Sequence, residues 1–343
     1  MRFSLRWLAM LLLPALVGCG GGADDKRLNV GGSTFVYPMM DKWASVYEKE
    51  KGVKVNYNSI GSGGGIRQMT DKTFDFGCSD APMNEEQLEN AKKQGGEVVH
   101  IPLVMGAVVP AFNLPGVTKP VRFTGPILAD IYMGEITNWS DKRLQDIQED
   151  GVVLPKLDIS VVHRSDGSGT TYIFVEYLTK VSSKWKDKIG MGTSVKFPVG
   201  VGQKGNEGVA GQVTRNPGAI GYIELIYALS NDIKFGAVKN KAGEYVVPSL
   251  ESVTAAGDAA LTDIPDDLRY SLTDATGQAS YPISGTVWAI VYVNPPQKDK
   301  LIVDFLRWAT HEGQQYAKDL HYATLPKGLV ERVEKKLDTI EVK

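Results

Sequence analysis

The sequence predicts an α/β protein in which short strands and helices alternate. Three observations support this fold class. Apolar strands and amphipathic helices alternate between residues 28 and 78, glycine-rich loops separate them, and 343 residues suffice for two lobes, each with its own core. Such units form mostly parallel sheets, in which ligands bind beyond the carboxyl ends of the strands.

The first strands and helices follow one another with short loops between them. Residues 28–30 form a predicted strand, and apolar residues at helical spacing from Met39 to Tyr47 predict a helix that ends near Gly52. Alternating apolar residues at 53–57 predict the second strand. A glycine loop then leads into a second helix.

The remaining elements are predicted from the same two periodicities. The second helix covers residues 66–72 and the third strand residues 74–78, while Asn84 and Gln87 form a capping box that opens a third helix. The apolar run 101–112 predicts a strand that crosses between the lobes. Later predicted elements are strands at 159–163, 219–225 and 287–293, a helix around 174–181, an irregular polar stretch of helix and loop at 252–274, and a last long helix around 302–309.

The first 27 residues are expected to lie outside the fold. Residues 1–18 are typical of a signal peptide, because two arginines precede an 11-residue apolar run that is shorter than the roughly 20 residues of a membrane-spanning helix. The run ends in a sequence that resembles a bacterial lipobox, which predicts lipidation of Cys19 and a flexible tether over residues 19–27. An ordinary signal peptide that happens to contain a cysteine is the alternative. Cys78 then has no disulfide partner, and we expect it to be a small buried residue.

Three loops have the composition of oxyanion-binding sites. Residues 31–35, 61–65 and 166–170 each join a predicted strand to a predicted helix through glycines and hydroxyl residues. The first N–H groups of a helix lack partners, and the helix dipole is positive there. Glycine lets an anion approach these N–H groups closely. One such loop is weak evidence, since small residues cap most helices. Three loops, one beside Arg164 and another followed by Asp80, favour a ligand held between two lobes.

Other classes of site fit these residues less well. The glycine loops lack the Gly-Lys-Ser/Thr of a phosphate-binding P-loop, and Asp166 stands where a nucleophile elbow around Ser168 would need glycine. The four histidines have no metal-ligand spacing, and His163 is expected to face away from Arg164. The net charge of −2 argues against a general nucleic-acid surface.

At these residues the chain resembles the periplasmic phosphate-binding proteins that serve high-affinity phosphate importers of the ABC class. The resemblance rests on "GGSTFVYPMMDKW", "VKVNYNSIGSGGGIRQ", "DFGCSDAPM", "VVHRSDGSGTTYIF", "VGQKGNEGVAGQV" and "NPGAIGYIE", which occur in family order, and on the tail from "YPIS" to "LHYATLP". Gly64 and Cys78 depart from the residues that relatives often carry, but neither corresponds to a ligand residue of the family.

The resemblance implies a two-lobed Venus-flytrap fold with two crossover segments and the ligand in the cleft between the lobes. One lobe would comprise residues 28–104 and 283–343, and the other residues 105–282. The implied phosphate ligands are Thr34, Phe35, Ser62, Asp80, Arg164, Ser168, Gly169 and Thr170, with Phe35 acting through its backbone N–H and Asp166 holding Arg164 by a salt link. The resemblance further implies no catalysis, no metal and no cofactor, with permease and ATPase subunits of an importer as partners. Together with the predicted lipidation of Cys19, it implies a location on the periplasmic side of a bacterial membrane, with the chain lipid-anchored through Cys19.

Asp80 predicts which anion the site would accept. A carboxylate repels an anion unless it receives a hydrogen from it, and phosphate carries such a hydrogen at neutral pH whereas sulfate does not. A site built around a ligand hydrogen rejects an analogue without it by roughly 10⁴ to 10⁵. Three alternatives remain at this point: a phosphatase or phosphoryl transferase, a binder of another oxyanion, and a phosphate sensor that serves no permease. Asp80 could also close a turn before Pro82.

Overall fold

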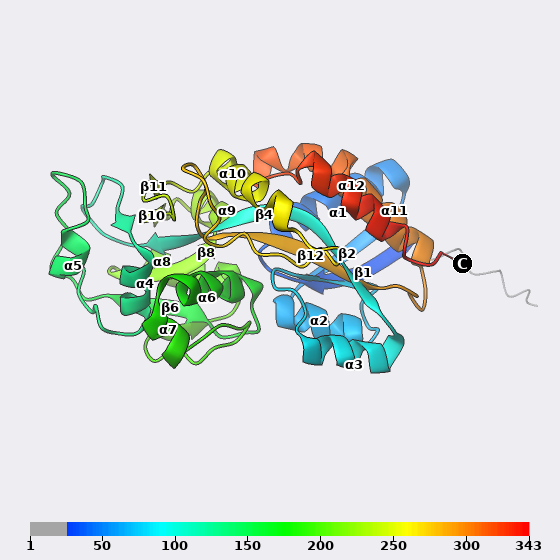
Figure 1. The fold of residues 1–343 in the computed structure, drawn as a ribbon, viewed down its shortest axis with the longest axis horizontal. Helices are drawn as coiled ribbons and strands as arrows, with labels where there is room; N and C mark the ends of the chain where they lie inside the picture. Colours follow the sequence, from blue (N-terminus) through cyan, green and yellow to red (C-terminus); the bar gives the residue numbers. More distant parts are fainter. Residues whose placement is uncertain (1–25, 343) are drawn as a thin grey trace, which may run out of the picture.

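The computed structural model describes residues 26–342 and has two lobes joined by a shared sheet (Figure 1). The predicted signal peptide and Cys19 lie outside the described residues. One lobe contains β1 (Arg27–Gly32), α1 (Tyr37–Lys51), β2 (Lys54–Ser59), α2 (Ser62–Thr70), β3 (Phe76–Ser79) and α3 (Glu85–Gly95), together with β12 (Ser284–Tyr292), α11 (Asp299–Thr310) and α12 (Lys327–Leu337). The strand β1 begins at Arg27, one residue before the predicted start of the fold, and residues 19–25 of the predicted tether lie outside the described residues.

The other lobe is built from the middle of the chain. Its elements are β5 (Arg122–Phe123), α4 (Gly125–Tyr132), α5 (Lys142–Gln145), β6 (Ser160–Arg164), α6 (Gly169–Val181), α7 (Ser183–Lys188), β7 (Val201–Gln203), α8 (Gly205–Arg215), β8 (Ala219–Glu224), α9 (Leu225–Ser230), β9 (Lys234–Phe235), β10 (Ala237–Lys239) and β11 (Tyr245–Val246). The helix α10 (Leu250–Ala260) follows and packs against β4. Short 3₁₀ turns lie at Leu261–Asp263, Glu312–Tyr316 and Lys318–Leu320.

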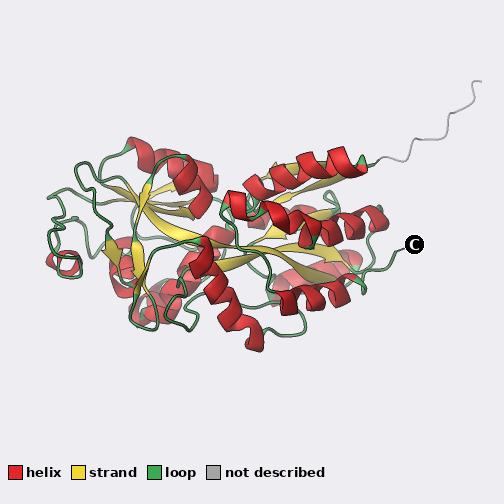
Figure 2. Cartoon of the chain, turned by 90° about the horizontal axis from the view of Figure 1, so that it is seen from above, coloured by secondary structure: helices red, strands yellow, loops and turns green. Residues whose placement is uncertain are grey.

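The strand β4 (Val98–Phe112) runs through both lobes. Its first part pairs with β12 in antiparallel register, and its last five residues, 108–112, pair with β8 of the other lobe. All residues of β4 from His100 onward are buried. The predicted crossing strand is therefore present, three residues longer at its start than expected. Figure 2 shows helices on both sides of the central strands.

The main sheet has the order β2-β1-β3-β12-β4-β8-β6-β7, with β9 paired to β4 as well. The strands β1, β2 and β3 are parallel, as are β6, β7 and β8. The expectation of a mostly parallel sheet holds within each of these two units, but it is wrong for the whole sheet, since β12 and β4 pair antiparallel with their neighbours. In both parallel units the carboxyl ends of the strands, and the loops that follow them, lie toward the junction of the two lobes.

The helix α2 differs most from its prediction. It begins at Ser62 rather than Ile66, so that Gly63, Gly64 and Gly65 belong to its first turn and not to a loop. Helical periodicity gave no signal there, because glycines have no side chain to alternate. Close packing explains their presence: a Cβ on Gly65 would lie 2.7 Å from the Cα of Gly32, so the helix could not sit this near to β1 with any larger residue.

The segment after α10 contacts the first lobe. Leu268 accepts a hydrogen bond from the indole N–H of Trp288 (2.8 Å), and Arg269 donates to the carbonyl of Met83 (3.1 Å). Arg332 donates to the carbonyl of Ile264 (2.7 Å). This segment belongs to the stretch 252–274, for which the sequence predicted an irregular mixture of helix and loop, and it contacts the first lobe through these three hydrogen bonds.

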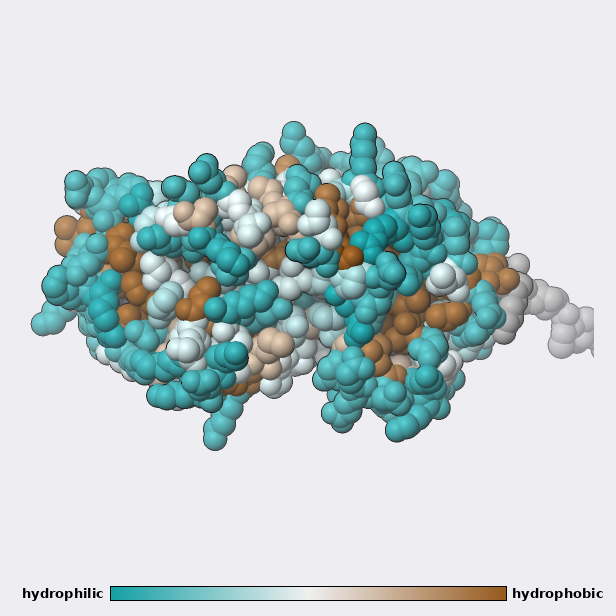
Figure 3. All heavy atoms as spheres, in the orientation of Figure 1, coloured by the Kyte–Doolittle hydropathy of each residue, from teal (hydrophilic) through white to brown (hydrophobic). Residues whose placement is uncertain are grey.

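The surface of the described residues is mostly hydrophilic on the face seen in Figure 3, with apolar residues in small groups. Between residues 26 and 342, no helix has the length and apolar character that crossing a membrane requires. Cys78 is buried in β3 as a free thiol, which confirms the expectation of a small buried residue.

Candidate functional site

Four helices begin where the two lobes meet. They are α1, α2, α6 and α8, and each follows a strand of one of the two parallel units. The first turn of α2 contacts the loop before α6, since the N–H of Gly63 donates to the carbonyl of Gly167 (2.9 Å). The loop before α1 contacts the start of α8, since the N–H of Asn206 donates to Thr34 Oγ1 (3.3 Å). The three loops that were predicted to bind an anion therefore lie close together where the lobes meet, and the start of α8 lies beside them.

Two glycines make this convergence possible. Gly61 has φ +85°, and a Cβ there would lie 2.4 Å from Asp166 Oδ2. A Cβ on Gly169 would lie 2.5 Å from both Asp80 Oδ2 and Ser62 Oγ. A side chain at either position would push the loops of the two lobes apart.

Every residue predicted to contact the ligand is buried. Asp80 is 2% exposed and Arg164 5% exposed, which is unusual for ionisable side chains. The other members of this buried set are Thr34, Phe35, Ser62, Ser168, Gly169 and Thr170. Such burial is tolerated only when polar atoms have partners.

Arg164 is held in a fixed orientation by Asp166. The carboxylate receives hydrogen bonds from Arg164 Nε (2.8 Å) and from one terminal nitrogen (2.6 Å), while the other terminal nitrogen lies 3.4 Å from Thr170 Oγ1. Burial alone would raise the pKa of Asp166, but the hydrogen bonds and charge of Arg164 outweigh it and hold that pKa below its usual value. The bidentate pair directs the remaining edge of the guanidinium toward Thr170.

Asp80 is a carboxylate in a region rich in hydrogen-bond donors. Ser33 donates to its Oδ1, and Ser62 Oγ lies 3.5 Å from its Oδ2 and accepts from the Asp80 N–H (3.2 Å). Burial raises the pKa of Asp80 to about 7, although the serines and the charge of Arg164 partly offset this effect. The group can therefore hold or release a proton near neutral pH.

Ser33 has a different role from the one that its loop suggested. Its Oγ accepts hydrogen bonds from the N–H groups of Phe35 (3.0 Å) and Val36 (3.4 Å), which occupy both lone pairs. Its hydrogen therefore points to Asp80, and Ser33 holds that carboxylate rather than facing an anion. The predicted contact of the Phe35 N–H with the ligand stays a prediction, because this N–H donates to Ser33 here.

Ser168 caps α6, since its Oγ accepts from the N–H of Thr171 (3.0 Å). Thr171 Oγ1 in turn lies 2.8 Å from the hydroxyl of Tyr222, which accepts from the N–H of Arg164 (3.0 Å). These bonds link the strand that carries Arg164 to the start of the helix. The end of β6 and the first turn of α6 are therefore held together by side-chain hydrogen bonds.

Sequence reasoning missed Asn206, which is fully buried at the start of α8. Its amide nitrogen lies 2.9 Å from Thr34 Oγ1 and 3.1 Å from Thr170 Oγ1. The signal was available, because β7, the loop and α8 repeat the strand-loop-helix pattern of the other three loops. Two tyrosines were also missed, Tyr57 and Tyr227, whose hydroxyls donate to the carbonyls of Ser33 (2.7 Å) and Thr34 (2.6 Å).

Glu224 is a second buried carboxyl group near this region. One of its oxygens caps α9 by accepting from the N–H of Ile226 (2.7 Å), whereas Oε1 has no hydrogen-bond partner among the described residues. Burial, with a smaller contribution from Asp80, raises the pKa of Glu224 well above its usual value.

His100 and His163 lie in structural settings. His100 accepts from the N–H of Met83 (3.1 Å), and burial lowers its pKa to about 3, so it is a neutral acceptor. His163 stacks on Phe197 with ring centres 4.5 Å apart. Within the described residues, no three His, Cys, Asp or Glu side chains are grouped as metal ligands would be.

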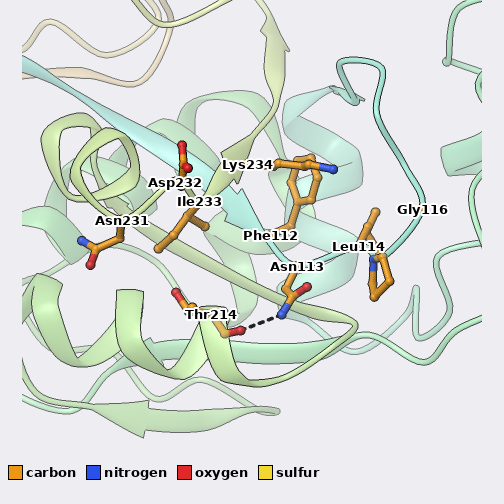
Figure 4. Close-up of a pocket in the computed structure, with 10 residues that line it drawn as sticks. Phe112, Asn113, Leu114, Gly116, Thr214, Asn231, Asp232, Ile233 and Lys234 are labelled. Atoms are coloured by element: carbon orange, nitrogen blue, oxygen red, sulfur yellow. Dashed lines mark hydrogen bonds between the residues drawn. The ribbon is translucent and has the colours of Figure 1, made fainter.

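A surface cavity of about 330 Å³ lies elsewhere, at the end of β4 (Figure 4). Asn113 donates to the carbonyl of Thr214 on its wall (2.8 Å). Thr214 lies near the C-terminal end of α8 and Asn206 near its start, about 12 Å away at 1.5 Å per residue. This cavity is therefore separate from the converging loops.

Comparison with known proteins agrees with the fold. A PBP superfamily domain matches residues 20–312. The "Phosphate-binding protein PstS" of Xylella fastidiosa (strain 9a5c) is 43% identical over 311 residues, covering 90% of this chain and 84% of that protein. The protein of the same name from Pasteurella multocida is 41% identical and covers 91% and 90%. A human phosphate binding apolipoprotein of known structure has a TM-score of 0.71 at 19% identity and covers 90% and 93%.

The raised pKa of Asp80 predicts a pH-dependent stability of the ligand-free protein. An unfolded aspartate loses its proton near pH 4, whereas Asp80 in the folded state keeps it up to about pH 7. Between these values the folded state binds the extra proton, so the free energy of unfolding falls as pH rises, by about 4 kcal/mol in total. Asp80→Asn should remove this part of the decline.

Urea unfolding of both chains between pH 4 and pH 8 measures the effect. The control is Asp150→Asn, which replaces an exposed aspartate and should leave the wild-type profile unchanged. Parallel profiles for the wild type and Asp80→Asn would contradict the prediction.

Proposed function

The chain belongs to the PBP superfamily and, within it, to the PstS phosphate-binding proteins, and on this premise we propose that it binds inorganic phosphate between its lobes for import by an ABC transporter. The role is that of a substrate-binding protein and not of an enzyme. The observation that carries the proposal is the buried carboxylate of Asp80 among hydrogen-bond donors from both lobes.

In this proposal each wall of the site supplies a different kind of contact. The charge comes from Arg164, which Asp166 orients, and Asp80 accepts the hydrogen that phosphate carries. Hydroxyl or backbone N–H groups bind the remaining oxygens, and the residues proposed for this are Thr34, Phe35, Ser62, Ser168, Gly169 and Thr170. An anion taken from water needs partners for nearly all its lone pairs, and dense donors provide them.

The proton between Asp80 and phosphate is shared by two groups that titrate in the same range. Burial brings the pKa of Asp80 to about 7. Both the monoanion and the dianion of phosphate carry a hydrogen that the Asp80 carboxylate can accept. The site therefore accepts either form of phosphate. Sulfate brings no proton, so above about pH 7, where Asp80 is ionised, it would meet a bare carboxylate.

We also propose the division of the chain into the lobes 28–104 with 283–343 and 105–282, which close on the ligand. The contacts between Gly63 and Gly167 and between Thr34 and Asn206 support this, since each joins one range to the other. A closed pair of lobes has a shape that permease and ATPase subunits of an importer could distinguish from the open form.

Lipid anchoring through Cys19 on the periplasmic side belongs to the same proposal. The support is the signal-peptide pattern of residues 1–18 and the cysteine that follows it. Membrane fractionation tests the anchor: the intact chain should sediment with membranes and Cys19→Ser should not. Equal amounts of both chains in the membrane fraction would contradict lipidation.

Titration calorimetry with phosphate and sulfate tests the proposed function. The wild type should bind phosphate and reject sulfate, and the rejection should grow as the pH rises above 7 and the carboxylate of Asp80 loses its proton. Asp80→Asn should keep phosphate binding within about tenfold, because its amide still meets an oxygen, while sulfate rejection falls by at least about tenfold. Asp71→Asn, an exposed change at the end of α2, serves as the control.

Two results would count against the proposal. A wild-type chain without heat of binding for phosphate would exclude the function itself. Unchanged sulfate rejection in Asp80→Asn would exclude the role given to that carboxylate.

A further inference from the structure

We propose that Asn206 is a positioning residue that forces the hydroxyls of Thr34 and Thr170 to act as donors toward the ligand. Its side chain lies between one threonine from each lobe, within 3.1 Å of both hydroxyl oxygens. The inference rests on the proposed phosphate site, to which it adds a residue that need not touch the ligand.

The orientation of the Asn206 amide is fixed by a backbone group. The N–H of Glu224 lies 3.0 Å from Asn206 Oδ1. A backbone N–H can only donate, so the atom facing it must be the amide oxygen. The NH₂ group therefore points the other way, and its two hydrogens reach the two threonines.

At Thr34, both acceptor positions of the hydroxyl oxygen are occupied. The oxygen receives hydrogen bonds from the Asn206 side chain (2.9 Å) and from the Asn206 backbone N–H (3.3 Å). A hydroxyl group has two lone pairs and one hydrogen. The hydrogen of Thr34 must therefore point away from Asn206.

At Thr170 the same condition arises from two different donors. The oxygen receives one hydrogen bond from the Asn206 side chain (3.1 Å) and one from Arg164 (3.4 Å). Neither the NH₂ group of asparagine nor a guanidinium can accept in return. The hydrogen of Thr170 is thus also available only to a third group.

These directions decide how phosphate sits in the site. Thr34 and Thr170 can bind only bare oxygens of the ligand, so its hydrogen is left to Asp80. Ser33 is fixed by the same logic, because two N–H groups occupy its lone pairs and turn its hydrogen to Asp80. Asn206 thereby contributes to the orientation of the ligand through both threonines.

Calorimetry with inorganic phosphate on Asn206→Ala tests the inference. Without the amide, each threonine hydroxyl is free to rotate and accept, and we expect the dissociation constant to rise about tenfold or more. Asn206→Ser is a second variant, whose hydroxyl is too short to reach both threonines. Thermal unfolding of each variant establishes that it is folded.

A mutant cycle separates positioning from a structural role. In a chain that already carries Thr34→Val and Thr170→Val, Asn206→Ala should add less than about threefold, because the hydroxyls through which it acts are gone. The control is Asn240→Ala, which removes a buried amide that accepts from Glu244 in the other lobe and should leave phosphate affinity unchanged.

The outcomes are distinguishable. Wild-type affinity in the folded Asn206 variants, or a full additional loss in the valine background, would overturn the positioning role while leaving the proposed function intact. A wild-type chain that binds no phosphate would overturn the proposed function and this role together.

Discussion

The interaction on which the rest of the structure depends is the one between a buried carboxylate and the donors around it. Asp80 sits close to Ser33, Ser62 and the guanidinium of Arg164, in a place where water cannot solvate it. Isolated burial of this kind is very unfavourable, and the pKa near 7 reflects the remaining cost. A ligand that brings both negative oxygens and a hydrogen satisfies the carboxylate and the donors at once.

The fold produces this site by directing helix N-termini from two parallel units to one point. In each unit the strands end at the junction of the lobes. The mostly buried strand β4 connects the two units. The glycines at 61 and 169 allow the loops of the two lobes to touch. Because the same contacts that complete the site also join the lobes, ligand binding and lobe closure are expected to be coupled.

Much of this could be predicted from the sequence, because local patterns carry it. The strands β1 and β2, the capping box at Asn84 and the crossing strand follow from periodicity and cap chemistry. Tertiary packing decides the rest. The glycines of α2 give no periodic signal, and the antiparallel pairing of β12 with β4 depends on residues nearly 200 positions apart. The helix α12 lies beyond the last helix that was predicted.

The candidate site, too, could be predicted only in part from the sequence. Hydroxyl and glycine residues before helices indicated three of the four loops, and the charges of Arg164 and Asp80 stood out in the sequence. The direction of each hydrogen bond could not be predicted, since it depends on which N–H groups occupy the lone pairs of a given hydroxyl. Ser33 thus proved to hold Asp80, and Asn206 emerged only once Thr34 and Thr170 were seen on either side of it.

A crystal structure of the mature chain with phosphate tests the central claim most directly. We predict one Asp80 carboxylate oxygen within hydrogen-bond distance of a phosphate oxygen, with Arg164 and hydroxyl donors on the other oxygens. A phosphate bound with the Asp80 carboxylate turned away from it, or an empty junction between the lobes at saturating phosphate, would contradict the account.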